Sequence, residues 1–124
     1  MKMTKDEVLN EIATAKDEGR VADVRGADLI GLDLSGINLE GADLRGTDFS
    51  GSNLRGAVLA EADLSGAILT GANLEYANLW GSWLRGACLD KANLRTTDLF
   101  GADLRGADTR GADFTGSNVL TEWL

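Results

Sequence analysis

Carboxylates and arginines are the side chains of this 124-residue chain that could do chemistry, and they recur in a fixed pattern. Residues 43–45 read Asp-Leu-Arg, as do residues 103–105, and residues 23–25 read Asp-Val-Arg. Such a stripe of arginines could bind phosphate, but neighbouring carboxylates are expected to compensate its charge. The chain has no histidine, so Cys88 has no imidazole to activate it as a nucleophile. We therefore expect no enzyme activity, no metal site and no cofactor.

Composition excludes several other classes of protein. Twenty acidic residues against 12 basic ones give a net charge of −8, which argues against direct binding of nucleic acid. One cysteine cannot form an internal disulfide, and no apolar run is long enough to cross a membrane. The first residues include acidic side chains where a signal peptide needs an apolar stretch. We expect a cytoplasmic protein with no membrane partner.

A five-residue repeat organises the chain from Val24 onward. A mostly bulky residue, usually Leu, stands at every fifth position up to Leu124, with a small residue two positions before it. Asp or Asn usually comes directly before this central residue, and Gly usually follows two positions after it. A period of five gives neither a single helical stripe nor one face of a flat strand. It suits a chain that turns a corner every five residues, with the central and small residues inside and Gly at the corner.

Units such as Ala-Asp-Leu-Arg-Gly at residues 42–46 and 102–106 resemble those of pentapeptide-repeat proteins. The unit at 72–76 departs from the pattern only at Tyr76, where Gly is expected. The resemblance covers residues 22–124 and implies an all-β solenoid, a right-handed quadrilateral β-helix of about five coils with four pentapeptides in each. An α-helical repeat is the structural alternative.

The two ends of such a rod differ. Residues 1–20 are expected to form an N-terminal α-helical cap, because Thr4 and Glu7 make a capping box and Gly19 suits the helix end. Residues 21–124 are expected to form the β-helix. Its last coil is predicted to end without a helix or polar cap, leaving Leu120, Trp123 and Leu124 as a candidate dimer end. Dimerisation through C-terminal ends, which the resemblance also implies, would give a homodimer.

Twenty residues per coil sort the outward positions into four faces. Faces one to four have their first central residues at Val24, Leu29, Leu34 and Leu39, and later members follow every twenty residues. Aspartate and arginine lie side by side on face one. Asp or Asn precedes the centres on face three, where it is expected to bond neighbouring backbone or the other members of its column. Face two is more acidic, and its candidate acidic residues are Asp28, Asp48, Asp90 and Asp108.

Apolar outward positions gather near the corner between faces four and one. They form a candidate interaction patch of Ala60, Trp80, Trp83, Phe100 and Leu120. Exposed aromatic clusters usually mark interfaces. The sequence leaves open whether this patch contacts a second copy or a foreign protein.

Two functions from different classes follow from these features. The first is a non-enzymatic structural scaffold that binds a protein partner through a rigid repeat rod. The alternative, which the resemblance suggests, is a DNA mimic that binds and inhibits or protects a type II topoisomerase. The negative charge permits the alternative, whereas the shortness of the rod and the arginines on its faces weaken it.

Overall fold

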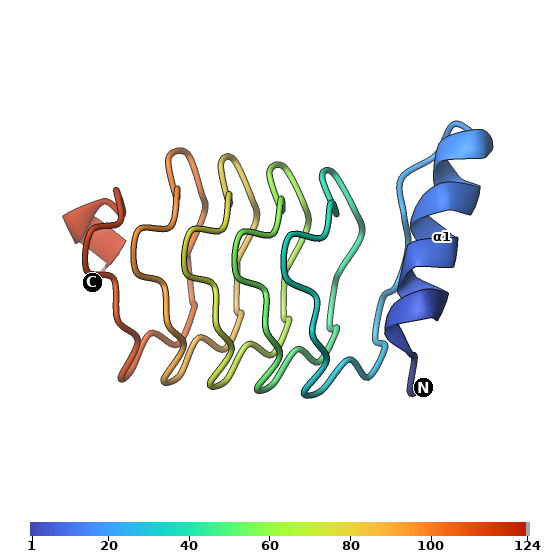
Figure 1. The fold of residues 1–124 in the computed structure, drawn as a ribbon. Helices are drawn as coiled ribbons and strands as arrows, with labels where there is room; N and C mark the ends of the chain where they lie inside the picture. The colour runs from blue at the N-terminus through green and yellow to red at the C-terminus, as the bar shows by residue number, and fades with distance from the viewer. Residues whose placement is uncertain (124) are drawn as a thin grey trace.

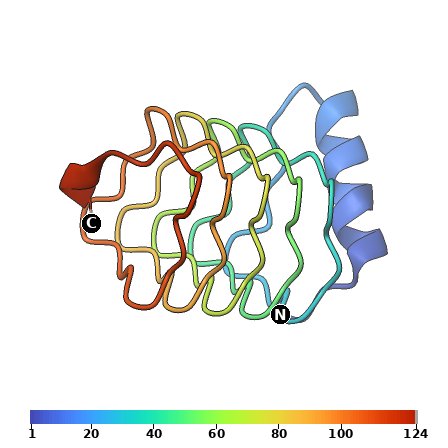
Figure 2. The same ribbon diagram turned by 60° about the vertical axis from the view of Figure 1, so that its left-hand side comes forward.

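The computed structural model describes residues 1–123, which form a rod of stacked coils with a helix at one end (Figure 1). Parallel bridges join residues twenty apart, beginning with Asp23↔Asp43 and ending with Asn93↔Asp113. These bridges form four ladders, one for each face, so each twenty-residue coil has four sides (Figure 2). The predicted quadrilateral solenoid and its register are therefore present.

The sides of the coil are shorter than the predicted strands. Among the described residues the coils contain only isolated single-residue bridges and no continuous strand, which corrects the expectation of short β-strands. Two residues of every five belong to the turn at the corner, so no side has two consecutive bridged residues. The coil stack nevertheless has the inter-coil hydrogen bonds of a parallel sheet.

A five-residue unit that has Asp or Asn before its central residue can satisfy all of its backbone N–H groups, as residues 43–47 illustrate. The N–H groups of Asp43, Leu44 and Gly46 donate to carbonyls of the neighbouring coils at 2.8, 2.8 and 3.0 Å. The Thr47 N–H donates to the Leu44 carbonyl at 3.1 Å and closes the turn. The remaining N–H, that of Arg45, donates to the side-chain Oδ1 of Asp43 at 3.3 Å.

This side-chain bond explains why Asp or Asn precedes most central residues. The same bond, two residues forward, recurs on all four faces, for example from Ile30 to Asp28, from Arg55 to Asn53 and from Phe100 to Asp98. The bond supplies an acceptor to an N–H that has no partner in a neighbouring coil, so it has structural value at each corner where Asp or Asn is present. The prediction that these Asp and Asn columns bond neighbouring backbone is confirmed.

The core is one continuous apolar column inside the coils. Central residues such as Leu64 and Leu74 are fully buried, and the small residues two positions before them, such as Ala62 and Ala72, lie beside them. Thr47 and Thr97 replace the small residue in two units, and their buried hydroxyls donate to carbonyls of the preceding coil. The assignment of inward positions from the repeat is confirmed.

Helix α1 (Lys5–Asp17) closes the N-terminal end of this column. Thr4 is its N-cap and forms a reciprocal capping box with Glu7, as predicted. The N–H groups of Gly19 and Arg20 bond carbonyls of the last turn, which ends the helix. Val8 and Ala15 are buried against the first coil and extend the core into the helix.

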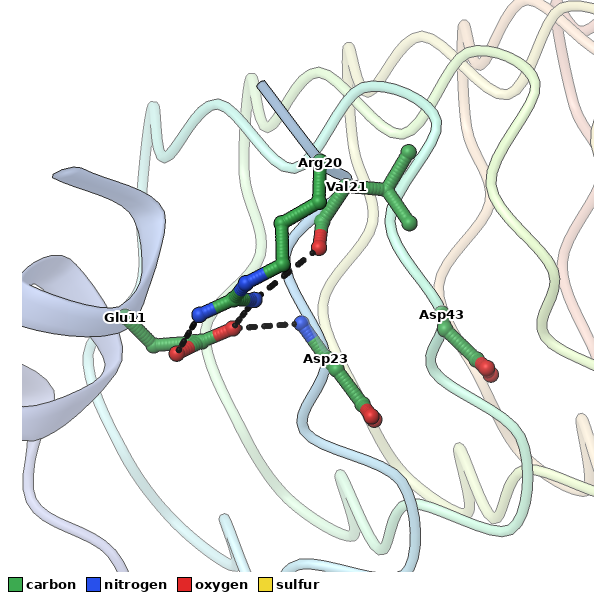
Figure 3. A pocket seen from close by; sticks show the side chains of 5 residues that line it. All are labelled: Glu11, Arg20, Val21, Asp23 and Asp43. Carbon is green, nitrogen blue, oxygen red and sulfur yellow. Dashed lines mark hydrogen bonds and ion pairs between the residues drawn. The ribbon is translucent and has the colours of Figure 1, made fainter. Parts of the chain in front are cut away.

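A polar clamp fixes α1 to the first coil (Figure 3). The Glu11 carboxylate on the helix accepts hydrogen bonds from the Arg20 guanidinium at 2.6 Å and from the Asp23 N–H at 2.9 Å. These groups, with Val21 and Asp43, line a hollow of about 450 Å³. Because Glu11 and Arg20 satisfy each other, we assign the hollow to attachment of the cap and to no ligand.

The C-terminal end departs from the prediction. Residues Thr121–Trp123 form a short 3-10 helix, η1, where no helix was expected. The bridge ladders stop at Asp113, and the Leu99 N–H donates to the side-chain Oδ1 of Asn118 at 2.6 Å, where other units use a backbone carbonyl. The chain therefore leaves the repeat register, and Trp123 packs half-buried against the core. It does not stand outward in the column of Trp83. Leu124 lies outside the described residues.

Four corners carry side chains in a backbone conformation that suits glycine. The clearest case is Thr96, with φ of 54°, in the corner column that also contains Gly56 and Tyr76. A left-handed conformation costs an L-residue roughly 1–2 kcal/mol, and a β-branched side chain adds to the strain. Gly56 adopts the same conformation with φ of 67° and has open space around its Cα.

We predict that Thr96→Gly stabilises the protein by about 1 kcal/mol, because relief of the left-handed strain exceeds the entropic cost of glycine. The midpoint of thermal unfolding should rise by about 4 °C, measured by circular dichroism. The control is Gly56→Thr, which should lower the midpoint by a similar amount. A lower midpoint for Thr96→Gly would contradict the assignment of strain to this corner.

Candidate protein-interaction surface

The aromatic surface comprises Trp80, Phe100 and Leu120 on face four with Trp83 across the corner on face one. Trp80 and Phe100 occupy the same position in successive coils, and 43% and 64% of their surfaces are exposed. Leu120, which the repeat assigns to the same column, lies beyond the last bridge and is 54% exposed. The structure thus brings three of the five predicted patch residues, Trp80, Trp83 and Phe100, to one edge of the rod, and Leu120 is exposed beyond the last bridge.

Ala60, the fifth predicted residue, is not part of this surface. It is only 6% exposed, although it occupies the same outward column as Trp80. Its side chain is a single methyl group in a column whose neighbouring members are Glu40 and Trp80. A side chain that short does not project beyond its neighbours, so the column position alone did not determine exposure.

Trp83 takes the place of an aspartate in the ladder of face one, between Asp63 and Asp103. Elsewhere on this face an arginine pairs with the aspartate two residues before it, as Arg45 does with Asp43 at 2.7 Å. Arg85 has Trp83 at that place. Its guanidinium lies over the indole ring, 5.5 Å from the centroid, and pairs with Asp103 on the next coil at 2.7 Å.

A shallow groove runs along the corner between Trp80 and Trp83. Its volume is about 240 Å³, and its lining residues are Gly81, Ser82, Trp83, Arg85, Gly101 and Asp103. Gly81 and Gly101, at the corners of two successive coils, contribute no side chain to the groove. The arrangement can accept an apolar or planar group beside the Trp83 ring.

Tyr76 is a further exposed aromatic residue, outside the aromatic surface and outside the predicted patch. It lies at the opposite corner of face four, is 56% exposed and has a left-handed backbone with φ of 60°. The Arg55 guanidinium lies 4.6 Å from the centroid of its ring. The signal was present in the sequence, since Tyr76 is the residue that interrupts the regular glycine of its unit.

Two of the three residues of the candidate dimer end lie within the described part of the chain. Leu120 is exposed, Trp123 is half-buried against the core, and Leu124 lies outside the described residues. Phe114 and Val119 are half-buried, whereas their counterparts in earlier coils are fully buried. The C-terminal coil therefore keeps an accessible apolar end that η1 covers only in part.

Three of the four predicted acidic residues of face two are engaged with their own surroundings. Asp28 accepts the Ile30 N–H and pairs with Lys2 at 3.5 Å. Asp48 accepts both the N–H and the hydroxyl of Ser50, at 2.9 and 2.6 Å. Asp108 pairs with the Arg110 guanidinium at 2.7 Å, which lowers the pKa of its carboxyl to about 2. Asp90 is half-buried and directly follows the central residue Leu89 on the same face.

The charge pairing expected on face one is also confirmed. Arg25, Arg45 and Arg105 each bind the aspartate two residues before them at 2.7–2.9 Å. Asp103 accepts from both Arg85 and Arg105, and these guanidinium groups hold the pKa of its carboxyl well below the usual range. The arginine stripe is therefore neutralised along the rod and offers little net positive charge to a phosphate.

Over residues 1–123, no group of three or more acidic, cysteine or histidine side chains converges in a way that could hold a metal ion. No helix within the same residues combines the length and apolarity that a membrane crossing requires.

Comparison with known proteins places this geometry in a family. The family described as pentapeptide repeats (8 copies) matches three overlapping segments, residues 22–59, 52–90 and 82–116. The chain belongs to the pentapeptide-repeat family, whose solved structures imply a right-handed quadrilateral β-helix. A comparison with curated proteins gives no significant match.

Two solved structures illustrate the likeness. HetL, a pentapeptide repeat protein involved in heterocyst differentiation regulation in the cyanobacterium Nostoc, is 37% identical with a TM-score of 0.83. The alignment covers 94% of this chain but 49% of HetL, so the chain spans about half the length of that relative. A pentapeptide repeat protein from the Arabidopsis thaliana thylakoid lumen is 32% identical with a TM-score of 0.50, over 81% of this chain and 66% of that protein.

The Asp108–Arg110 pair gives a testable pKa. We predict that Arg110→Gln returns the pKa of Asp108 from about 2 towards its ordinary 3.8, measured by NMR titration of the carboxyl. Because the folded-state pKa lies below the unfolded value, the pair stabilises the fold fully above about pH 3.8 and loses this effect as pH falls through about 2. Arg105→Gln is the control and should leave the pKa of Asp108 unchanged. An unaltered pKa in Arg110→Gln would refute the pairing.

Proposed function

We propose that this protein is a non-enzymatic interaction scaffold that binds a protein partner through its aromatic surface. The observation that carries the proposal is the exposure of Trp80, Trp83 and Phe100 at one edge of the rod. Tryptophan and other large side chains dominate the binding energy of protein interfaces, and most folded proteins bury them. The coils hold these side chains at fixed spacing, which limits the conformational entropy lost on binding.

The remaining surface supports binding in preference to catalysis. The sequence supplies no histidine, and the carboxylates that accompany the arginines are engaged in ion pairs or in bonds to backbone N–H groups. These pairs stabilise the coils and leave no base beside a nucleophile. As part of the same proposal we place the protein in the cytoplasm, where its free thiol, Cys88, would stay reduced.

Mimicry of DNA is the weaker of the two candidate functions. A DNA mimic needs an array of free negative charges, and a net charge of −8 supplies the sign. However, Asp28 and Asp108 on face two are paired with Lys2 and Arg110, and Asp48 bonds Ser50. Face one alternates charge in the same way. The structure therefore favours the aromatic surface over the acidic column as the binding site.

The scaffold proposal predicts crosslinks that depend on the aromatic surface. A photo-reactive phenylalanine analogue in place of Phe100 should form covalent adducts with a protein partner in cells that produce the chain. The same analogue in place of Thr115, which is exposed on face three, is the control and should give no such adduct. Trp80→Ser should remove most of the adduct, because an interface aromatic typically contributes about 2 kcal/mol or more. The absence of any adduct at position 100 would reject the proposal.

We further propose that the protein forms a homodimer through its C-terminal end. Phe114, Val119 and Trp123 are half-buried there, and Leu120 extends the apolar surface onto the side of the rod. A two-fold contact would bury this surface on both copies at once. Pairing side by side through Trp80 and Phe100 is the alternative arrangement.

Sedimentation velocity over a wide range of concentration separates these arrangements. Trp123→Ser with Leu124→Ser should convert an end-to-end dimer to a monomer, because it removes apolar area that the two-fold contact would bury. Trp80→Ser with Phe100→Ser is the matched control and should leave that dimer intact. If the control pair dissociates the dimer and the C-terminal pair does not, the side-by-side arrangement is correct. A native protein that remains monomeric rejects both.

A further inference from the structure

Face four differs from the other faces in its charge. It comprises residues 37–41, 57–61, 77–81, 97–101 and 117–120 of the described chain, and these segments contain no lysine or arginine. Each of the other faces has at least two basic residues. The charged residues of face four are Glu40, Glu61 and Asp98. The ion pairs found among the described residues lie on the other faces and at the cap, so these three carboxylates have no basic partner.

Two of these carboxylates lie next to the residues that carry the exposed rings. The Glu61 N–H donates to the Trp80 carbonyl at 2.8 Å, and its Cγ lies 3.6 Å from the point where a Cβ on Gly81 would stand. The Glu61 side chain therefore extends over the next coil beside Trp80. Asp98 accepts the Phe100 N–H at 3.0 Å and the Asn118 side-chain N–H at 2.9 Å through the same oxygen, Oδ1, so its carboxylate lies at the backbone of the residue that carries the second ring.

The aromatic rings at the two edges of face four each bind a cation of this chain. Tyr76 and Trp83, at its two corners, each have an arginine of this chain over the ring, at 4.6 and 5.5 Å from the centroid. Trp80 and Phe100 lie between those corners and have no such cation among the described residues. An exposed cation–π contact contributes roughly 0.5–1 kcal/mol, and more when water is excluded from it.

We propose that face four binds an arginine-bearing peptide segment of a partner protein, with guanidinium groups over Trp80 and Phe100 and paired with Glu61 and Asp98. Apolar residues of the same segment would pack on Leu120 and in the groove beside Trp83. This inference rests on the proposed scaffold function and adds the chemistry of the partner. Charge complementarity selects the occupant, because a carboxylate beside each free ring favours a cation and repels acidic surfaces.

The test uses a synthetic peptide that alternates arginine with leucine and serine, and the same peptide with neutral citrulline in place of arginine. Binding to the full chain is measured by isothermal titration calorimetry, and the site is mapped by NMR shifts. The arginine peptide should bind face four, and the citrulline peptide should bind about tenfold more weakly, since each lost cation–π and ion-pair contact weakens binding.

Two double variants separate a specific site from general attraction to an acidic protein. Glu61→Gln with Asp98→Asn should weaken binding of the arginine peptide about tenfold, while asparagine still caps the Phe100 N–H. Asp33→Asn with Asp63→Asn removes the same charge from faces three and one and should change binding less than about twofold. Trp80→Ser with Phe100→Ser should weaken binding at least as much as the loss of the carboxylates.

Several results would overturn the inference. Equal weakening by the two charge variants, shifts on another face, or equal affinity for the citrulline peptide would each do so. A native dimer that the arginine peptide leaves intact, but that Trp80→Ser with Phe100→Ser dissociates, would show that a second copy occupies the face. If crosslinks form at position 100 but the arginine peptide does not bind, the scaffold function stands and the partner chemistry proposed here is wrong.

Discussion

The hydrogen bonding of a backbone that turns every five residues is the constraint on which this structure depends. In residues 43–47, three N–H groups donate to neighbouring coils, one closes the turn, and the fifth needs the Asp43 side chain. The inter-coil bonds impose the twenty-residue period, and the fifth bond favours Asp or Asn before the central residue, a position that other residue types occupy in four of the bridged units. Much of the negative charge of the rod is therefore carried by aspartates that accept hydrogen bonds from backbone N–H groups.

That constraint gives the acidic residues of the surface a structural role. A carboxylate that caps an N–H and binds an arginine, as Asp43 and Asp103 do, has a structural role before any functional one. Ion pairs between exposed side chains contribute little to stability, but here they lower the charge repulsion between stacked aspartates. Net charge by itself is therefore weak support for DNA mimicry in a protein of this architecture.

Departures from the repeat are where the surface becomes distinctive. Trp83 replaces a capping aspartate, and Tyr76 replaces a corner glycine in a left-handed conformation. Neither substitution stabilises the coil. Both place an aromatic ring at the surface, where an arginine of this chain lies over it. Face four lies between them and has free rings and free carboxylates, which is why the proposed interaction is assigned to that face.

The sequence by itself determined the coil, the inward Leu and Ala positions and the capped N-terminal helix, because a strict period and a capping box are local patterns. Only the tertiary structure decided how exposed each outward side chain is and how the C-terminal end folds. Ala60 is buried because its side chain is shorter than those of its column, although its register is outward. Trp123 turns onto the core because the ladder stops at Asp113 and η1 begins after Leu120. A repeat fixes where a residue stands in its coil, whereas the contacts it makes depend on neighbours twenty residues away.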